Sequence, residues 1–153
     1  YEDDASRAER LLDELIAFLR VALPHLRNAS SSVPREAELA RAYARLHALA
    51  GARDVGMKLS VSADLMDARF PPGVLLLLLD EALRGGSGPC ALNATRSSGG
   101  CRVVLTLPAP PADVALTRVR TLLADLYGSS AELVVDDANG AVSATMRVPY
   151  ERA

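Results

Sequence analysis

The sequence has few residues of the kinds that hold metals, form disulfide scaffolds or bind nucleic acid. It contains only two cysteines and two histidines, and no C-x-x-C or His/Cys cluster has the spacing of zinc ligands. Its formal net charge is −2, which indicates neither a nucleic-acid surface nor an affinity for anionic membranes. We therefore expect no metal and no nucleic-acid partner. The low cysteine content favours a reducing compartment such as the cytoplasm.

Long apolar runs and a secretory leader are also missing. The longest aliphatic run, Val74–Leu79, is far shorter than the ~20 residues that a membrane-spanning helix needs. The start of the chain lacks the basic region and small-residue cleavage site of a signal peptide. Because the sequence opens on Tyr1 and not on Met, we expect a fragment of a longer protein. Any membrane anchor of that protein is then expected outside this chain.

What the sequence does contain is a set of helical patterns. Apolar residues spaced by three and four predict a helix over 4–23, with Pro24 closing it and a polar stretch after it. A second apolar stripe predicts a helix over 34–50. The leucine-rich run at 73–86 and the stretch at 114–127 predict two more.

Alternating patterns predict strands between and after these helices. The turn signals "SSGG" and "ANG" each join two strand candidates into a hairpin. The predicted fold is a two-layer α/β sandwich, a mixed and mainly antiparallel sheet with helices on one face, plus an N-terminal helix. The expected division is an N-terminal helix at 1–26, a linker at 27–33 and one domain at 34–153. The strand candidates are 57–62, 91–96, 101–107, 131–137 and 141–150.

The N-terminal helix has an apolar face that allows two interpretations. Either the helix packs on its own domain, or it forms part of a dimer bundle. The spacing of this seam suits another helix, and further apolar residues widen it beyond a simple two-stranded seam. We expect a homodimer through this helix. The seam comprises Ala8, Leu12, Leu15, Leu19 and Ala22.

Five stretches resemble one family, in the same order along the chain. "FPPGVLLLLLDEALRGG" (70–86) is similar to the proline pair and leucine-rich helix that end in the N box, E-N-A-(L/I)-K-H-G, of LytS-like sensor histidine kinases in the GHKL ATPase superfamily. The resemblance implies the GHKL two-layer sandwich and, in the family, ATP and Mg²⁺ as cofactors. The other matching strings are "LRVAL" (19–23), "EAELARAY" (36–43), "DVALTRVRTLLADLYG" (113–128) and "AVSATMRVP" (141–149).

The positions that match the family's nucleotide site hold different residues. Glu81 stands where the family's N-box Asn ligates Mg²⁺, and Arg84 stands where the family has Lys. Ala109 replaces the Asp that accepts from the adenine amino group. Asp113 replaces a glycine that brings backbone amides to the phosphates, and Val142 replaces a Thr of the last strand. The candidate cofactor-binding positions are thus Glu81, Arg84, Gly86, Ala109, Asp113 and Val142.

These replacements predict a lost nucleotide site. Alanine accepts no side-chain hydrogen bond, and losing a charged acceptor from a buried site costs about 2 to 4 kcal/mol. Pro110 and Pro111 remove amide donors where the family has Asn and glycine. Asp113 sets a negative charge at a helix start that should receive an anion. Only Ala112 separates Pro111 from Asp113, so the family's lid is absent.

The resemblance and its departures lead to one interpretation with two alternatives. We expect a degenerate domain, that is, a pseudokinase with no catalytic residue and no bound cofactor. Its expected role is that of a regulatory or dimerisation module in bacterial two-component signalling, with a signalling protein as a partner. One alternative is a working kinase domain that binds ATP through Glu81 and Arg84. The other is a small-molecule sensor that reuses the emptied pocket. Whether the chain is an enzyme is left open at this point.

Several smaller features receive simple interpretations. His25 is expected to be a surface linker residue, and Glu81 and Arg84 are expected to pair at the rim of the site. The stiff "PAPPAD" segment (108–113) is expected to fill the emptied pocket. A turn centred on "SSGG" places Cys101 near position 96, so a disulfide between Cys90 and Cys101 is not expected.

Overall fold

The protein's structure, a computed structural model, describes residues 2–51, 55–138 and 140–153. Within these ranges the helices are α1 (Glu2–Arg27), α2 (Val33–Gly51), α3 (Val74–Gly85) and α4 (Asp113–Tyr127). The longer strands are β2 (Met57–Val61), β4 (Cys90–Ser97), β5 (Gly100–Leu107), β6 (Glu132–Ala138) and β7 (Ala141–Pro149). Two-residue strands β1 (Ser31–Ser32) and β3 (Arg69–Phe70) and short 3₁₀ turns at Ala63–Leu65 and Gly128–Ser130 complete the described chain.

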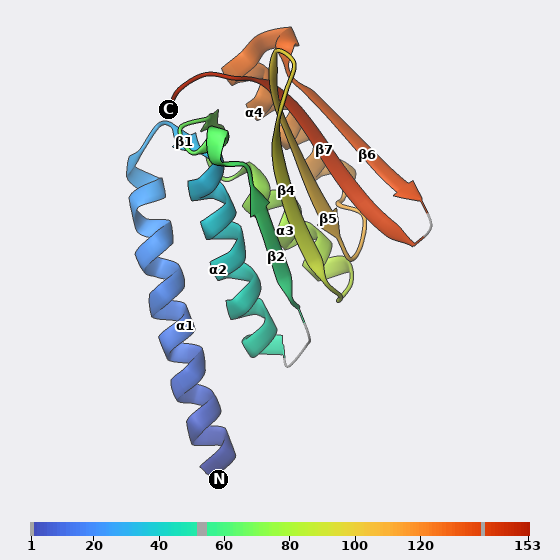
Figure 1. Cartoon of the computed structure of the whole chain (residues 1–153). Helices are drawn as coiled ribbons and strands as arrows, with labels where there is room; N and C mark the ends of the chain where they lie inside the picture. The colour runs from blue at the N-terminus through green and yellow to red at the C-terminus, as the bar shows by residue number, and fades with distance from the viewer. Residues whose placement is uncertain (1, 52–54, 139) are drawn as a thin grey trace.

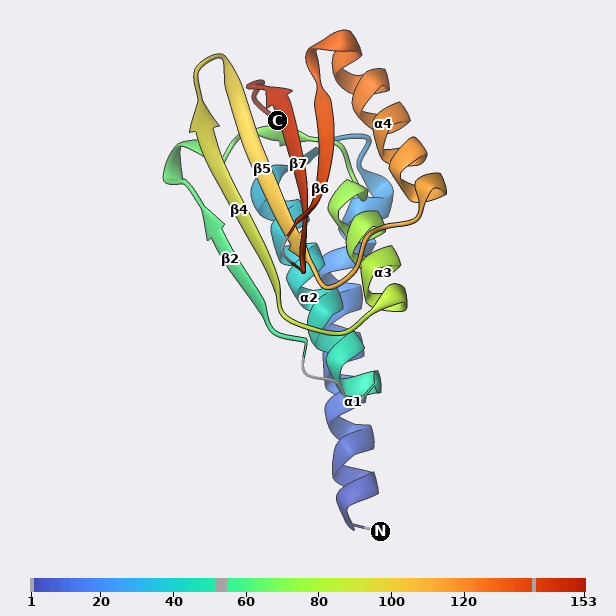
Figure 2. The ribbon, with the colours of Figure 1, turned by 90° about the vertical axis from the view of Figure 1, so that its right-hand side faces the viewer.

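The molecule has two layers, one of strands and one of helices. The five longer strands form one sheet in the order β2-β4-β5-β7-β6, in which β2 runs parallel to β4 and all other neighbours are antiparallel. Helices α2, α3 and α4 cover one face of this sheet (Figures 1 and 2). The predicted two-layer α/β sandwich with a mixed, mainly antiparallel sheet is therefore confirmed.

The leucine run forms the central helix of the helical layer. Helix α3 contacts both α2 and α4, so side chains on several of its faces are covered. This explains why the run is almost unbroken and lacks the polar face of a surface helix. Burying each such side chain contributes about 1.5 to 3 kcal/mol. The fully buried leucines of α3 are Leu75, Leu78, Leu79 and Leu83.

The N-terminal helix is longer than the sequence predicts. Pro24 was expected to end it, but α1 contains Pro24 and continues to Arg27. An interior proline removes one N–H donor and costs about 3 kcal/mol, so contacts beyond it must hold the last turn. Such contacts exist, because His25 lies against the buried Glu36 of α2. The N-terminal part of α1 projects beyond the rest of the helical layer (Figure 1).

The stretch predicted as a linker contains a short strand. Ser31 and Ser32 pair with Phe70 and Arg69 in an antiparallel two-stranded ladder, just before α2 begins. Strands of two residues carry no alternation, so the sequence pattern could not predict them. The ladder holds the start of α2 against the segment that leads into α3.

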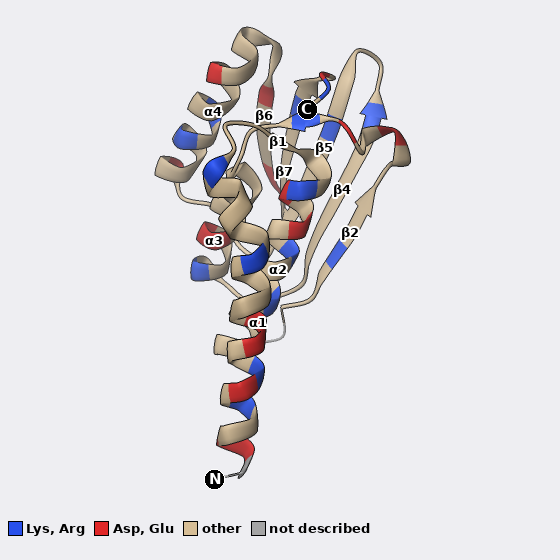
Figure 3. Ribbon diagram, turned by 90° about the vertical axis from the view of Figure 1, so that its left-hand side faces the viewer, with Lys and Arg blue, Asp and Glu red and all other residues tan. Residues whose placement is uncertain are grey.

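The described residues contain neither a helix that could span a membrane nor a cluster of metal-binding side chains. Arginines are interspersed with Asp and Glu along α1 (Figure 3). None of the helices described is both long and apolar enough to cross a membrane. Residues 2–51, 55–138 and 140–153 also hold no group of three or more His, Cys, Asp and Glu side chains that could bind a metal ion.

Candidate functional site

Three of the residues singled out from the sequence, Glu81, Arg84 and Gly86, lie at the C-terminal end of α3. Glu81 is half-buried and Arg84 is exposed on the last turns of this helix. Gly86 is the C-cap, and its N–H donates to the carbonyl of Ala82 at 3.1 Å. The chain then crosses to β4. Three other segments provide the remaining candidates, which are Ala109 after β5, Asp113 at the start of α4 and Val142 in β7.

Arg84 is engaged by a residue that the sequence analysis did not single out. Its Nη2 lies 3.0 Å from Oδ2 of Asp80, one helical turn earlier, and the expected rim pair with Glu81 is therefore wrong. The hydroxyl of Tyr43, on α2, donates to the other oxygen of Asp80. Burial, followed by this hydrogen bond, raises the pKa of Tyr43 to about 12. Tyr43 fixes Asp80 in place, and the i,i+4 spacing brings Arg84 to it.

The segment after β5 lies directly against the glycines that follow α3. A Cβ atom at Gly85 or at Gly86 would be 3.2 Å from Cβ of Ala109, and one at Gly86 would also be 3.3 Å from the carbonyl oxygen of Pro108. Both distances are shorter than ordinary van der Waals contact. Pro111, three residues after Pro108, is buried. Gly86 therefore allows the two segments to touch, which is a packing reason for a glycine there.

The other candidates are not brought together by polar contacts. Val142 is 4% exposed and pairs with Leu107 in the β5–β7 ladder, so it belongs to the core beside the end of β5. Asp113 is exposed. In the part of the chain that the structure describes, no side-chain hydrogen bond or ion pair joins Asp113 or Glu81 to another residue. The site thus contains a contact between two of the chain's own segments, the one after β5 and the glycines that follow α3.

Comparison with known proteins gives matches among solved structures alone. No protein-family model matches the sequence, and no curated protein matches it. The nucleotide-free catalytic domain of the histidine kinase ThkA superposes with a TM-score of 0.64 at 11% identity, over 81% of this chain and 97% of that one. The histidine kinase AdeS of Acinetobacter baumannii gives a TM-score of 0.63 at 11% identity, over 98% of this chain and 82% of that one.

A structure described as a bacterial phosphotransferase matches with a TM-score of 0.56 at 15% identity, over 95% of this chain and 79% of that one. The chain has the fold of histidine kinase catalytic domains. At these identities the likeness concerns the fold, which is the GHKL-type sandwich that the resemblance implied. The chemistry of this chain's own site must be argued from its residues.

A groove lies between the helices, away from the candidate positions on the last turns of α3. Its volume is about 450 Å³, and it runs between Leu76, Leu77 and Asp80 of α3 and the middle of α4, at Arg118 and Leu122. Five surface pockets along the described residues, this one included, are lined by side chains other than Glu81, Ala109 and Val142. The groove is lined by Tyr43, Gly73, Leu77, Asp80, Arg118 and Leu122, among others.

His25 is not the surface linker residue that the sequence predicted. Its side chain is 12% exposed and lies on the last turn of α1, with Nε2 at 3.1 Å from Oε1 of Glu36. Glu36, in the first turn of α2, is fully buried. The sequence contained one hint, because a lone acidic residue at a helix start can be held by neighbouring donors. It could not show that the chain would fold a histidine onto that carboxylate.

The remaining titratable candidates have structural roles. His47 is half-buried on α2, with its ring centroid 6.0 Å from that of Tyr43. Cys90 and Cys101 are free, as expected, and the structure shows that both are buried. Cys101 pairs with Arg96 across the hairpin, which is the register that the sequence predicted.

Proposed function

We propose that this chain is a degenerate ATPase-like domain of a LytS-type sensor histidine kinase homologue. It acts as a regulatory and dimerisation module in two-component signalling, in the cytoplasm, and does not bind ATP. The observation that carries the proposal is the close approach of Ala109 to Gly85 and Gly86, at 3.2 Å for an added Cβ. These are positions that match opposite sides of the family's nucleotide pocket. This packing supports the loss of nucleotide binding, because a base placed between these positions would require the segment after β5 to move.

The electrostatics around the site support the same proposal. Arg84, which matches a lysine of the family, is already paired with Asp80 at 3.0 Å. Asp113 places a carboxylate at the positive end of α4, where an anionic phosphate would otherwise be stabilised. In the alternative of a working kinase that binds ATP through Glu81 and Arg84, Arg84 would have to leave Asp80 and the phosphates would have to bind beside the carboxylate of Asp113.

Helix α1 supports the dimerisation part of the proposal. One side of α1 packs on α2, where the rings of Phe18 and Tyr43 lie 5.9 Å apart. A second side leaves large apolar side chains exposed. We call this exposed face the α1 stripe; its members repeat with the spacing of a coiled-coil seam and suit a second copy of the helix. The stripe consists of Leu12, Leu15, Ile16, Leu19, Leu23 and Leu26.

Isothermal titration with ATP and Mg²⁺ tests the loss of nucleotide binding. We expect no saturable heat, and a dissociation constant below about 100 µM, which corresponds to about −5.5 kcal/mol, contradicts the proposal. Ala109→Asp is the matched variant because it restores one acceptor without removing the prolines. Binding gained by this variant alone would make the missing acceptor the main reason for the loss. Continued absence of binding would point to the packing of the segment.

The groove between α3 and α4 favours a second candidate function, a small-molecule sensor. Its volume of about 450 Å³ lies within the usual range of small-molecule sites. Leu76, Leu77 and Leu122 provide an apolar lining, and Asp80 and Arg118 provide charges of opposite sign. A thermal-shift screen of small metabolites tests it, with Leu76→Trp as the variant that fills the groove. A ligand whose stabilising effect survives this substitution binds elsewhere.

A further inference from the structure

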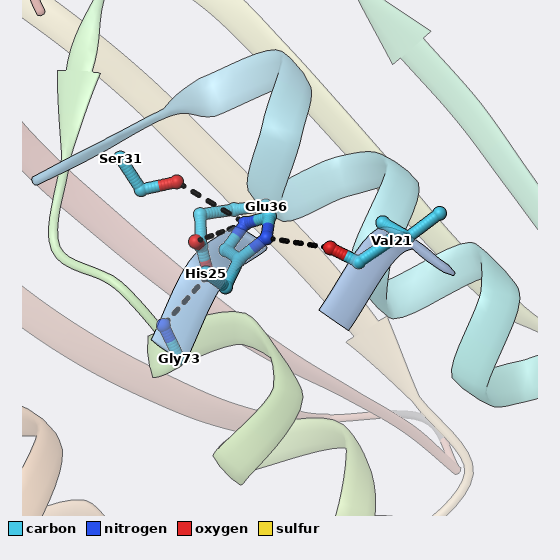
Figure 4. Close-up of polar contacts among 5 residues, drawn as sticks. All are labelled: Val21, His25, Ser31, Glu36 and Gly73. Atoms are coloured by element: carbon cyan, nitrogen blue, oxygen red, sulfur yellow. Dashed lines mark hydrogen bonds and ion pairs between the residues drawn. The ribbon is translucent and has the colours of Figure 1, made fainter. Parts of the chain in front are cut away.

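A fully buried carboxylate lies where three helices meet. Glu36 has no exposed surface, although charged side chains are almost never buried without a partner. Figure 4 shows its surroundings, which come from separate parts of the chain: His25 at the end of α1, Ser31 in β1 and Gly73 at the start of α3. The position of this carboxylate makes it a connection between the N-terminal helix and the helix that carries the candidate site.

A continuous line of polar contacts runs through this carboxylate. The ring atom Nδ1 of His25 lies 3.0 Å from the carbonyl oxygen of Val21 on α1, and Nε2 lies 3.1 Å from Oε1 of Glu36. On the other side, the N–H of Gly73, the N-cap residue of α3, donates to Oε2 of Glu36 at 2.8 Å. The line therefore joins α1 to α2 and α2 to α3 (Figure 4).

The chemistry of these atoms requires a proton between His25 and Glu36. A backbone carbonyl can only accept, so the contact with Val21 places a hydrogen on Nδ1 of His25. In neutral histidine the other ring nitrogen is then an acceptor, and an ionised carboxylate oxygen is an acceptor as well. Two acceptors 3.1 Å apart repel each other unless one proton lies between them. Oε1 of Glu36 has no hydrogen-bond partner among the described residues, and the Ser31 hydroxyl, 3.3 Å from Nε2 of His25, has one hydrogen and can donate to only one of the two acceptors.

We propose that His25 and Glu36 form a proton-dependent latch, which holds the C-terminal turn of α1 against α2 and α3 while the pair keeps one proton and releases it when that proton leaves. The latch is a property of the contact between α1 and the domain. It goes beyond the proposed function and does not depend on whether the domain binds ATP.

The burial of Glu36 works in the direction that the latch needs. Burial raises the pKa of Glu36, and the neighbouring Ser31 hydroxyl, Gly73 N–H and His25 ring oppose this rise. A raised pKa means that Glu36 holds a proton more tightly in the docked state than in the undocked state. Unpaired histidine and glutamate titrate near ~6.5 and ~4.3, so above about pH 6.5 an undocked pair holds no proton. Docking then takes up a proton, and it weakens as the pH rises.

Charged side chains and one helix dipole surround the pair. Arg20 on α1 and Arg35 and Glu38 on α2 line a pocket of about 360 Å³ together with His25. The carboxylate of Glu38 pairs with Arg41, 2.6 Å away. Strand β1 contributes the uncharged Ser31, and the start of α3 contributes the positive end of its dipole. The two guanidinium groups and this dipole place positive charge beside the pair.

Amide hydrogen exchange on the 153-residue chain tests the latch directly. Protection of the peptide over 19–33, corrected for the intrinsic pH dependence of exchange, should fall between pH 6.5 and pH 8.5 by about ten- to a hundredfold, because each pH unit changes docking up to about tenfold. Strand β5 should keep its protection over the same range. Equal protection of 19–33 at both pH values overturns the proposal.

Three variants separate the latch from general stability. Glu36→Gln supplies an amide donor to neutral His25 and an acceptor to Gly73, so its protection over 19–33 should persist at pH 8.5. His25→Gln should likewise lose the pH dependence, since a glutamine amide donates at every pH. His47→Gln, at the chain's other histidine, should keep the full pH dependence. A pH-dependent loss that survives in both Glu36→Gln and His25→Gln overturns the proposal.

If the two latch variants fail to fold by circular dichroism, nitrogen-15 spectra of the unmodified chain decide. We expect the His25 ring to keep its hydrogen on Nδ1 throughout, and Nε2 to lose its proton over the same pH range in which 19–33 loses protection. A His25 ring that exchanges freely between its two neutral tautomers, as exposed histidines do, overturns the proposal.

Discussion

The exposed area of the α1 stripe allows an estimate of the free energy that its burial contributes to dimerisation. Leu12 and Leu19 are 57% and 41% exposed, so together they leave about one leucine side chain per copy uncovered. Burial of that surface in both copies of a dimer contributes about 3 to 6 kcal/mol, at about 1.5 to 3 kcal/mol for each leucine. The double substitution Leu12→Glu with Leu19→Glu removes this contribution and places like charges on the seam.

This loss corresponds to a large change in the dissociation constant. A factor of ten accompanies each ~1.4 kcal/mol, so 3 to 6 kcal/mol raises the constant about a hundred- to ten-thousandfold. Sedimentation equilibrium over a wide range of protein concentrations measures it. We expect the unmodified chain to be a dimer at micromolar concentrations and the double variant to be a monomer.

A matched control separates the stripe from added charge. Ser6→Glu with Ala17→Glu adds the same two carboxylates to exposed positions of α1 that lie off the stripe, and it should leave the dimer intact. Two results refute the reasoning. One is an unmodified chain that stays monomeric at the highest concentrations reached, and the other is a control that dissociates as far as the stripe variant does.

Two further predictions concern the stability of the fold. A Cβ at Gly100 would collide with the backbone carbonyl of Val148 in the neighbouring strand, so Gly100→Ala should lower the free energy of unfolding by about 2 kcal/mol or more. Gly56→Ala is the control, because a Cβ there meets nothing within 4 Å, and it should change the free energy of unfolding by less than about 1 kcal/mol. Equal urea midpoints for the two variants would contradict this prediction, because they would show that β7 can shift to accommodate the added methyl group without a loss of stability. Tyr127 donates to the carbonyl of Arg69 at 2.7 Å, and burial raises its pKa above the ordinary value of 10.0. Because the pKa of Tyr127 is raised on folding, its hydroxyl stabilises the fold fully below pH ~10, and this stabilisation is lost as the pH rises further. Tyr127→Phe should therefore be less stable by about 1 kcal/mol at pH 7, and its free energy of unfolding should fall less than that of the unmodified chain between pH 9 and pH 11. An alkaline loss as steep as that of the unmodified chain would assign the titration to another group.

Local signals allowed most elements of the fold to be predicted. The helix α3 begins after the proline pair and ends at the double glycine, as its sequence indicates. Both hairpins form around their turn signals, and the predicted pairing of position 96 with Cys101 is confirmed. These features depend on residues that are neighbours in the chain, which is why periodicity and turn chemistry were enough.

The errors came from positions where distant segments meet. Pro24 would end most helices, yet α1 continues to Arg27, and its last turn contacts α2 through His25. Arg84 had two acidic residues within reach on its own helix, and Tyr43 of α2 holds the one that it contacts, Asp80. In both cases the deciding partner lies on another helix, and no spacing along the chain reveals it.

The sequence by itself determined the order of helices and strands, the two-layer architecture and the chemical identity of the residues at the candidate site. It also showed Ala109 and the two prolines after it in the segment that follows β5. Only the tertiary structure decided that Ala109 lies against Gly86 and that His25 meets the buried Glu36. The physical reason is that amphipathic periodicity specifies which face of an element is buried, whereas the partner on that face depends on how the elements pack in three dimensions.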